Sequence, residues 1–277
     1  MIELPEAKSL SEQLLKKFYG KTITYVVANH SPHKLAWFWG DPNGYGELLC
    51  GKKITGSNAV AGHVEMHAED CCISFEGGVT LRYLEAGESE PSRHQLYIRF
   101  DDGTALVGAI QMYGGLYAYV EGQNDNYYYI MAKEKPSPLT DEFDEMYYND
   151  MFANSKKTLS AKAFLTTEQR IPGLGNGVLQ DILFNAHIHP RLKLEAFDNQ
   201  QKKDLFYSIK HVLNEMVVGG GRDVEKDIFG NQGKYKTKMS TLTRGKQCPV
   251  CGDTIMCEAF LGGKIYYCPT CQPYVKG

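Results

Sequence analysis

The pattern of apolar and polar positions divides the chain into a strand-rich first half and a helical second half. Between residues 22 and 131, short segments rich in β-branched and aromatic residues are separated by turn signals such as Asp-Pro-Asn-Gly and Asp-Asp-Gly. The clearest segments are 22–27, 72–75, 95–100 and 115–120. Because short strands at such spacing usually stack in two layers or close on themselves, this half predicts a β-sandwich or barrel.

Apolar residues at helical spacing predict one helix before the strands and four helices after them. Residues 9–18 are expected to form the first helix, because Ser9 and Glu12 have the spacing of a capping box. A proline-containing linker at 133–138 follows the strands, since proline cannot continue a helix. The later helices are expected at 141–154, 159–167, 175–187 and 199–218.

Composition places the chain among ordinary globular proteins. Hydrophobic residues make up 43% and charged residues 23% of the 277 residues, and no apolar run approaches the ~18 residues that span a bilayer. The N-terminus has no basic segment followed by an apolar stretch, so we expect no signal peptide, a cytoplasmic location and no membrane partner. We also expect a monomer. Eight cysteines fit a reducing compartment if four of them hold a metal ion.

Charge is distributed unevenly along the chain. Up to Ser155 there are 12 lysines and arginines against 22 acidic residues, and from Lys156 onward there are 18 against 11. Within the second half, residues 222–246 carry seven basic side chains against three acidic ones. Basic residues that merely solvate helices would be mixed with acidic ones, whereas a segregated basic half is typical of a surface that binds a polyanion. The second half is therefore predicted to bind nucleic acid.

Two Cys-x-x-Cys pairs near the C-terminus predict a metal site. Cys248 and Cys251 form the first pair and Cys268 and Cys271 the second, with 16 residues between the pairs. Four thiolates satisfy the tetrahedral preference of Zn²⁺ and leave no open position, so the spacing indicates one structural zinc per chain rather than disulfides or a redox pair. Gly252 permits the left-handed turn of a zinc knuckle. The other cysteines are expected to pack as small hydrophobic residues: Cys50, Cys71, Cys72 and Cys257.

A glycine-rich turn separates two of the expected helices. Pro172 ends the first helix, and Gly173 and Gly175 permit tight turns with positive φ. Asn176 can cap the helix that follows, and the N–H groups at such a helix start can bind a phosphate. An ordinary turn between helices would have the same composition, so the turn alone leaves both interpretations open.

Three separated motifs resemble the formamidopyrimidine-DNA glycosylase and endonuclease VIII family. The Gly-Leu-Gly-Asn-Gly turn at 173–177, followed by Ile-His-Pro at 188–190, resembles the family's helix–two-turn–helix. The chain opens Met-Ile-Glu-Leu-Pro-Glu, where the family's mature chain opens Pro-Glu-Leu-Pro-Glu, and its cysteine pairs have the spacing of the family's zinc finger. The resemblance implies an α+β fold of three domains: an N-terminal β-sandwich opened by a helix at 1–132, a helix–two-turn–helix domain at 140–244 and a four-cysteine zinc finger at 245–277.

The resemblance also implies a function in base excision repair, with damaged double-stranded DNA as the partner. Asn176 matches the family's phosphate-binding asparagine, and Lys156 or Lys157 resembles another phosphate contact. Tyr113 matches a segment that fills the void left by an extruded base, and extrusion serves chemistry that cannot reach its target inside the stack. The basic stretch after position 222 corresponds to a loop that closes over that base. Further DNA contacts are expected from Arg222 and Lys264.

The family's catalytic residues are only partly matched. The family nucleophile is the secondary amine of an N-terminal proline, which forms a Schiff base at the sugar. Ile2 occupies that position here, so we expect Met1 to be retained and the terminal amine to lie one residue further out. Glu3 matches the glutamate that helps with proton transfer.

Three supporting positions also depart from the family pattern. His63 stands where the family has a strand lysine, and Gly263 stands where the zinc finger has an arginine. The segment Gln-Met-Tyr-Gly at 111–114 replaces Arg-Arg-Phe-Gly, so Met112 takes the place of an arginine. His63 and His67 are expected to be structural, because histidines in strands are often partly buried.

Several functions remain compatible with these residues. The chain is either an active glycosylase and lyase that uses another amine, or a glycosylase that activates water through Glu3, or a binding protein on a catalytically retired scaffold. A primary amine can also form a Schiff base, so an active lyase would use Met1, Lys52 or Lys53. Binding of structured RNA is a further alternative, because a basic surface with a zinc ribbon does not distinguish the two nucleic acids. Altered or absent chemistry is favoured, since several catalytic positions differ together.

Overall fold

A computed structural model describes residues 1–274 and divides the chain into two compact units. The first unit comprises Met1–Lys133 together with Glu225–Gln232, and the second comprises Glu134–Val224 and the chain from Gly233 onward. None of the helices in residues 1–274 is long and apolar enough to cross a membrane.

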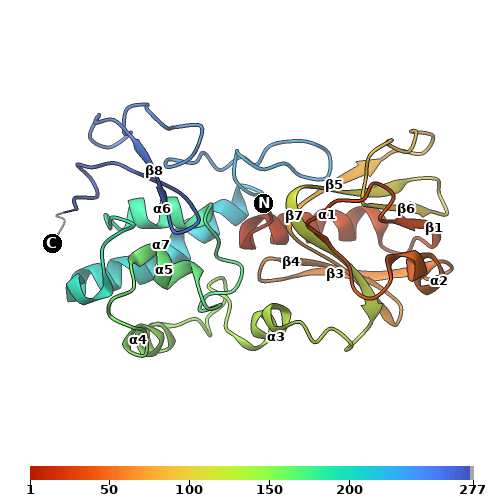
Figure 1. Cartoon of the computed structure of the whole chain (residues 1–277), viewed down its shortest axis with the longest axis horizontal. Helices are drawn as coiled ribbons and strands as arrows, with labels where there is room; N and C mark the ends of the chain where they lie inside the picture. The colour runs from red at the N-terminus through yellow and green to blue at the C-terminus, as the bar shows by residue number, and fades with distance from the viewer. Residues whose placement is uncertain (275–277) are drawn as a thin grey trace. The chain divides into compact units, whose positions relative to one another are not determined.

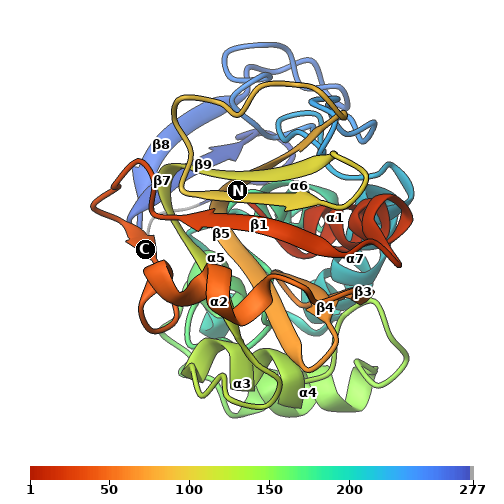
Figure 2. The same ribbon diagram turned by 90° about the vertical axis from the view of Figure 1, so that its right-hand side faces the viewer.

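The first unit is built on a seven-stranded sheet (Figure 1). Neighbouring strands along the order β1-β6-β7-β5-β4-β3 are antiparallel, and β2 joins β7 in parallel. Figure 2 shows β1 and the short helix α2 at the front of this unit. The strands are β1 (Ile23–Ala28), β2 (Ala36–Trp37), β3 (Ile54–Val60), β4 (His63–Ala68), β5 (Cys71–Leu84), β6 (Leu96–Phe100) and β7 (Ala105–Val120). The predicted β-rich half of an α+β fold is thereby confirmed.

Two of these strands are much longer than their sequence segments indicated. β5 and β7 run side by side for most of their length, with a shift in register between Gly77 and Val79. Gly77 has a φ of 68°, which an L side chain rarely adopts, and a Cβ at Gly78 would lie 2.6 Å from the carbonyl oxygen of Tyr113. Such irregularities bend a strand locally and increase its twist. The glycines therefore form the bend that the pattern of apolar residues did not reveal.

Helix α1 (Leu4–Phe18) packs against β3 and β4 (Figure 1). It begins five residues earlier than predicted, because Glu3 and Glu6 form a capping box and Pro5 lies in the first turn, where proline is tolerated. The predicted cap at Ser9 is therefore wrong. The apolar positions Leu10, Leu14 and Phe18 are buried, as expected for the face that covers a sheet. Two other helices of this part were not predicted: α2 (Tyr45–Leu49) and α3 (Tyr127–Glu134).

The second unit is helical and ends in a β-hairpin. Its longest helix, α7 (Asn199–Val218), has the predicted bounds because a capping box at Asp198 and Gln201 fixes its start. Figure 1 shows α6 beside α7, and the hairpin strand β9 contacts α6. The remaining elements are α4 (Glu145–Ala153), α5 (Ala161–Thr166), α6 (Val178–Asn185), β8 (Met256–Phe260) and β9 (Gly263–Tyr267). Short 3₁₀ turns occur at Pro42–Gly44 in the first unit and at Leu194–Ala196 in the second.

Candidate functional site

The four cysteines of the paired motifs converge at the base of the β8–β9 hairpin. Their sulfur atoms all lie within 4.8 Å of one another. The Sγ atoms of Cys248 and Cys271 are 3.8 Å apart, and those of Cys251 and Cys268 are 3.4 Å apart. Four sulfur ligands at such separations can hold a metal ion that prefers tetrahedral coordination.

Tight turns position these sulfur atoms. After the first pair, Gly252 adopts a φ of 81°, as predicted, and its N–H donates to the carbonyl oxygen of Cys248 at 2.9 Å. Burial raises the pKa of the Cys248 thiol, but the backbone N–H groups of Cys251 and Val250 outweigh burial and lower that pKa to about 7. A thiol that ionises near neutral pH is prepared to bind a metal ion, because the thiolate is the ligand.

The glycine-rich turn and the tip of the hairpin meet in a set of five residues, named here the hairpin–turn cluster: Lys162, Asn176, Gln180, Gly263 and Lys264. Asn176 Nδ2 and Gln180 Nε2 each donate to the carbonyl oxygen of Lys264 at 3.1 Å. Gln180 Oε1 accepts from the N–H of Tyr266 at 3.0 Å. These bonds fasten the start of α6 to β9, so the hairpin lies directly against the turn.

The prediction that Asn176 caps α6 is wrong. Gly177 is the N-cap residue of α6, and the Asn176 side chain is used by the hairpin instead. Gly173 has the expected positive φ of 77°, whereas Gly175 does not have a positive φ. The Oδ1 atom of Asn176 is buried and has no hydrogen-bond partner among the described residues.

Lys162 is one of two members of this cluster that sequence reasoning missed, the other being Gln180. The Lys162 side chain is only 3% exposed, and Nζ donates to the carbonyl oxygen of Phe260 at 2.6 Å. A methyl group at Gly263 would lie 3.2 Å from Asn176 Oδ1 and 3.3 Å from Lys162 Nζ, so the absence of a side chain there makes room for both. The sequence contained one sign that Lys162 is buried, because it is the single charged residue within the apolar run Ala-Lys-Ala-Phe-Leu of α5.

The chain start occupies a second set of residues, named here the N-terminal corner: Met1, Ile2, Glu3, Tyr113 and Glu225. The α-amine of Met1 forms an ion pair with Glu225 Oε2 at 2.5 Å. Ile2 is buried, and its N–H donates to the carbonyl oxygen of Gly77 at 2.7 Å. In this chain the nitrogen of residue 2, where the motif comparison expected a terminal proline amine, is the backbone amide of Ile2. This amide is bonded to β5.

Curated proteins named formamidopyrimidine-DNA glycosylase align with the chain along its whole length. The protein of Legionella pneumophila subsp. pneumophila (strain Philadelphia 1) is 25% identical over 281 residues, covering 99% of this chain and 100% of the relative. The protein of Bacillus cereus is 25% identical over 283 residues, with the same coverage. No family model matches the chain.

Solved structures with the same fold come from the same group of proteins. The Lactococcus lactis Fpg in complex with DNA containing an abasic site has a TM-score of 0.83 at 22% identity, and the match covers 98% of this chain and 100% of that one. The MutM (Fpg) protein of Thermus thermophilus has a TM-score of 0.80 at 20% identity, covering 99% and 100%.

The chain is similar along its whole length to proteins named formamidopyrimidine-DNA glycosylase, and it shares the fold of the solved Fpg structures. α5, the glycine-rich turn and α6 lie where the motifs predicted two helices joined by a turn, and the four cysteines adjoin the hairpin of β8 and β9. The α+β fold that the motifs implied is confirmed.

The other predicted DNA contacts lie in different environments. Lys156 and Lys264 are exposed. Lys157 Nζ donates to the carbonyl oxygens of Phe152 at 2.8 Å and Ala153 at 3.2 Å, so it stabilises the C-terminal end of α4. Arg222 is enclosed, with 2% of its surface exposed, so its contact with DNA stays a prediction.

Glu3 and Tyr113 adjoin Met1 in the N-terminal corner. Glu3 is 4% exposed at the start of α1. The Tyr113 hydroxyl donates to Met1 Sδ at 3.4 Å. Burial and the negative charge of Glu3 raise the pKa of Tyr113, so this hydroxyl stays protonated at neutral pH. No local signal in the sequence pointed to Glu225, which is 224 positions from Met1.

Two positions at which the family pattern is broken are also on the first unit. Met112 is exposed on β7. His63 is buried, and its Nδ1 lies 3.1 Å from Glu76 Oε2, while Glu76 Oε1 accepts from the Tyr117 hydroxyl at 2.7 Å. Burial lowers the pKa of His63, against the opposing charges of Glu76 and Glu65, so this imidazole is neutral at neutral pH. Such surroundings are those of a structural histidine.

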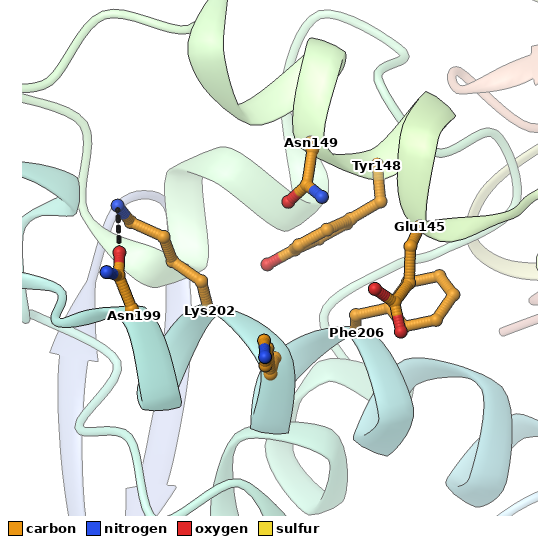
Figure 3. Close-up of a pocket in the computed structure, with 7 residues that line it drawn as sticks. Glu145, Tyr148, Asn149, Asn199, Lys202 and Phe206 are labelled. Atoms are coloured by element: carbon orange, nitrogen blue, oxygen red, sulfur yellow. Dashed lines mark hydrogen bonds between the residues drawn. The ribbon is translucent and has the colours of Figure 1, made fainter.

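The second unit also has a pocket of about 290 Å³ between α4 and α7 (Figure 3). Lys202 Nζ lies 3.5 Å from Asn199 Oδ1 on one side of it, and Glu145 lies on the other side. The Tyr148 hydroxyl between them is buried without a hydrogen-bond partner among the described residues. None of the predicted site residues lines this pocket, so it is separate from the hairpin–turn cluster.

Proposed function

We propose that this chain is a DNA-repair glycosylase-family protein that binds damaged duplex DNA and lacks the proline-dependent lyase chemistry. The observation that carries the chemical half of the proposal is the ion pair of the Met1 amine with Glu225, beside a buried Ile2. The whole-length likeness to proteins named formamidopyrimidine-DNA glycosylase supports the binding half, as does the likeness to an Fpg complex with DNA that contains an abasic site.

The proposed DNA-binding parts are the helix–two-turn–helix domain at 140–244 and the zinc finger at 245–277, attached to a glycosylase-like domain at 1–132. Zn²⁺ is the proposed occupant of the four-cysteine centre, because a closed set of four thiolates suits that ion. Its function would be structural, since it holds the base of the hairpin whose tip joins the hairpin–turn cluster.

Binding is proposed to follow from positive charge and backbone donors. The chain from Lys156 onward has 18 basic against 11 acidic residues. Asn176 lies at the start of α6, where the positive end of a helix favours a phosphate. Lys156 and Lys264 are exposed and add charge that phosphate contacts require.

The absence of the usual lyase step follows from where the amine lies. An amine that pairs with a carboxylate as ammonium has no lone pair for attack, and Schiff-base formation needs that lone pair. A chain start extended by one residue shifts the amine by up to about 3.5 Å. Because a misplacement of about 1 Å can reduce a rate about a hundredfold, Met1 is a poor substitute for a terminal proline.

The test combines binding and trapping on matched oligonucleotides. Fluorescence anisotropy should give tighter binding to a duplex with an abasic-site analogue than to the same duplex undamaged or to an RNA duplex of the same sequence. Borohydride should trap no covalent complex with a natural abasic duplex, whereas an authentic family enzyme, run in parallel, should be trapped. Preference for the RNA duplex would overturn the binding proposal, and trapping mapped to Met1, Lys52 or Lys53 would show an active lyase.

A further inference from the structure

A second group of metal-ligating side chains lies on the sheet of the first unit. His67 on β4, Cys72 on β5 and Glu121 just after β7 each present one donor atom, and these atoms all lie within 4.8 Å of one another. His67 is paired with Cys72 across β4 and β5, and Cys72 with Tyr119 across β5 and β7. Because side chains alternate along a strand, Glu121 projects on the same face as Tyr119. Three adjacent strands therefore converge on one point.

The imidazole of His67 is already oriented as a metal ligand requires. Its Nδ1 faces Glu121 Oε1 and its Nε2 faces Asn58 Oδ1. Asn58 in turn donates from Nδ2 to Glu65 Oε2 at 2.9 Å. Metal-bound histidines usually donate their second N–H to an oxygen that fixes the ring, and Asn58 supplies that oxygen here. In the tautomer that donates from Nε2 to Asn58 Oδ1, Nδ1 carries the lone pair that a metal ion requires.

The charges around this point favour a cation. Glu65 is buried and Glu121 adds a second carboxylate, while Lys133 is the nearby ammonium whose pKa the Tyr129 hydroxyl and these carboxylates raise. One ammonium against two carboxylates leaves an excess negative charge. The buried Cys72 thiol would bind a metal ion as the thiolate, after loss of its proton. A divalent ion with one thiolate would add one net positive charge and balance the site.

We propose that His67 Nδ1, Cys72 Sγ and a Glu121 carboxylate oxygen form a three-ligand site for Zn²⁺ or a similar borderline divalent ion. Binding breaks the S–H bond of Cys72, releases that proton to solvent and separates Nδ1 of the neutral His67 imidazole from the Glu121 carboxylate around the metal. Three protein ligands leave a fourth position for water, unlike the closed four-cysteine centre. From the sequence, His67 was expected to be structural and Cys72 to pack as a small hydrophobic residue. The proposal assigns both as ligands of one metal ion.

Metal content of the full chain tests the site. After equilibration with excess Zn²⁺ and removal of unbound metal, elemental analysis should give one equivalent more than the four-cysteine centre accounts for. Glu121→Gln, a change at an exposed position, and His67→Gln should each lose that equivalent. Cys50→Ser is the matched control, because Cys50 is an exposed cysteine of the same unit outside the group, and it should keep the full content.

Cobalt gives a second readout that is specific to sulfur. When Co²⁺ is added to protein whose four-cysteine centre already holds Zn²⁺, a thiolate-to-cobalt charge-transfer band should appear, and Cys72→Ala should remove it. Asn58→Ala should weaken Co²⁺ binding about 10–100-fold, as expected for loss of the oxygen that orients a ligating histidine. Near-ultraviolet circular dichroism checks that each variant is folded, and the Glu121→Gln result stands on its own if Cys72→Ala does not fold.

Two results would overturn the proposal. One is a metal content that stops at a single equivalent in the unmodified chain. The other is a second equivalent that persists in both Glu121→Gln and His67→Gln, since it would then bind elsewhere.

Discussion

The hairpin–turn cluster and the N-terminal corner differ in what their side chains and backbone amides are bonded to. In the hairpin–turn cluster, Asn176, Gln180 and Lys162 bond to backbone carbonyls of the hairpin, so the frame is intact although Gly263 stands where the family has an arginine. In the N-terminal corner, the fold is intact as well, but Ile2 uses its N–H in a bridge to Gly77. The hairpin–turn cluster is held by several side-chain bonds to backbone carbonyls, whereas Schiff-base chemistry would depend on a single amine. The latter can therefore be lost without any change of fold.

Among the experiments that test this comparison, removal of the metal ion should have the largest effect, because it should change both folding and DNA binding. Cys268→Ser should lower the zinc content by one equivalent and unfold the hairpin, because a structural zinc can contribute about 10 kcal/mol of apparent binding free energy to folding. Binding to duplex DNA should be lost with it, while the sheet of the first unit stays folded. Elemental analysis and hydrogen exchange would measure both effects.

Cys257→Ser is the control for that experiment, since Cys257 lies on the same hairpin outside the cluster of four sulfur atoms. It should retain metal and DNA binding. Full zinc content in Cys268→Ser would contradict the assignment of the centre.

Acid should loosen the helical unit through His189. Burial lowers the pKa of His189 from 6.5 to about 4, and its ring lies against Tyr267 of β9 and Tyr274, at 4.4 and 4.6 Å between ring centroids. Because the unfolded chain keeps the ordinary pKa, it binds more protons than the folded chain between these two values. The stabilisation is therefore complete above about pH 6.5 and is lost as pH falls toward about 4, by up to about 3 kcal/mol.

Urea unfolding at about pH 7 and about pH 5, followed by tyrosine fluorescence, would measure this loss. His189→Phe keeps the ring without the titration, so its free energy of unfolding should depend less on pH than that of the unmodified chain. Equal pH dependence in the two proteins would exclude His189 as the cause.

Covalent trapping tests the N-terminal corner directly. We expect at least about a hundredfold less borohydride-trapped complex than with an authentic family enzyme, because the Met1 amine is displaced and ion-paired. Ile2→Pro with Met1 removed should restore little activity, since His63, Met112 and Gly263 still replace the supporting residues. Strong trapping by that variant would show that the amine alone had been missing.

The sequence predicted the elements whose determinants are local. α7 was placed at its observed bounds because its apolar period lies within the helix itself and Gly219, which ends it, follows directly. The four cysteines were grouped correctly because their ligand spacing is local within each pair. The motifs also indicated the family, since three of them occur in the expected order.

Features that depend on distant pairing were missed. The full lengths of β5 and β7 are set by their mutual register, which the short apolar segments did not contain. Glu225 reaches Met1 across almost the whole chain, so no spacing rule could connect them. Lys162 was overlooked because a lysine in a short helix is normally exposed, and only the hairpin carbonyl of Phe260 explains its burial.

Substitutions in the hairpin–turn cluster should have the smallest effect on DNA affinity. They distinguish two functions of this cluster, namely contact with phosphate and support of the hairpin. Asn176→Ala removes a bond to the Lys264 carbonyl, and Lys162→Met removes the bond to Phe260 while keeping much of the side-chain volume. Each should weaken binding to any duplex about tenfold, or about 1.4 kcal/mol, as expected for a lost hydrogen bond in an interface. Lys203→Met, a change on the exposed face of α7, is the control and should leave affinity unchanged.

The salt dependence of the same variants then identifies the cause. A lysine that contacts a phosphate contributes about one unit to the slope of log affinity against log salt, because its contact releases a counterion. Lys162 is enclosed and already bonded to a backbone carbonyl, so we expect Lys162→Met to lower affinity at an unchanged slope. If Lys162→Met instead reduced the slope of log affinity against log salt by about one, the Lys162 ammonium would contact a phosphate. Unchanged affinity in both Lys162→Met and Asn176→Ala would contradict the proposal that this cluster binds DNA, since neither the contact nor its support would then matter.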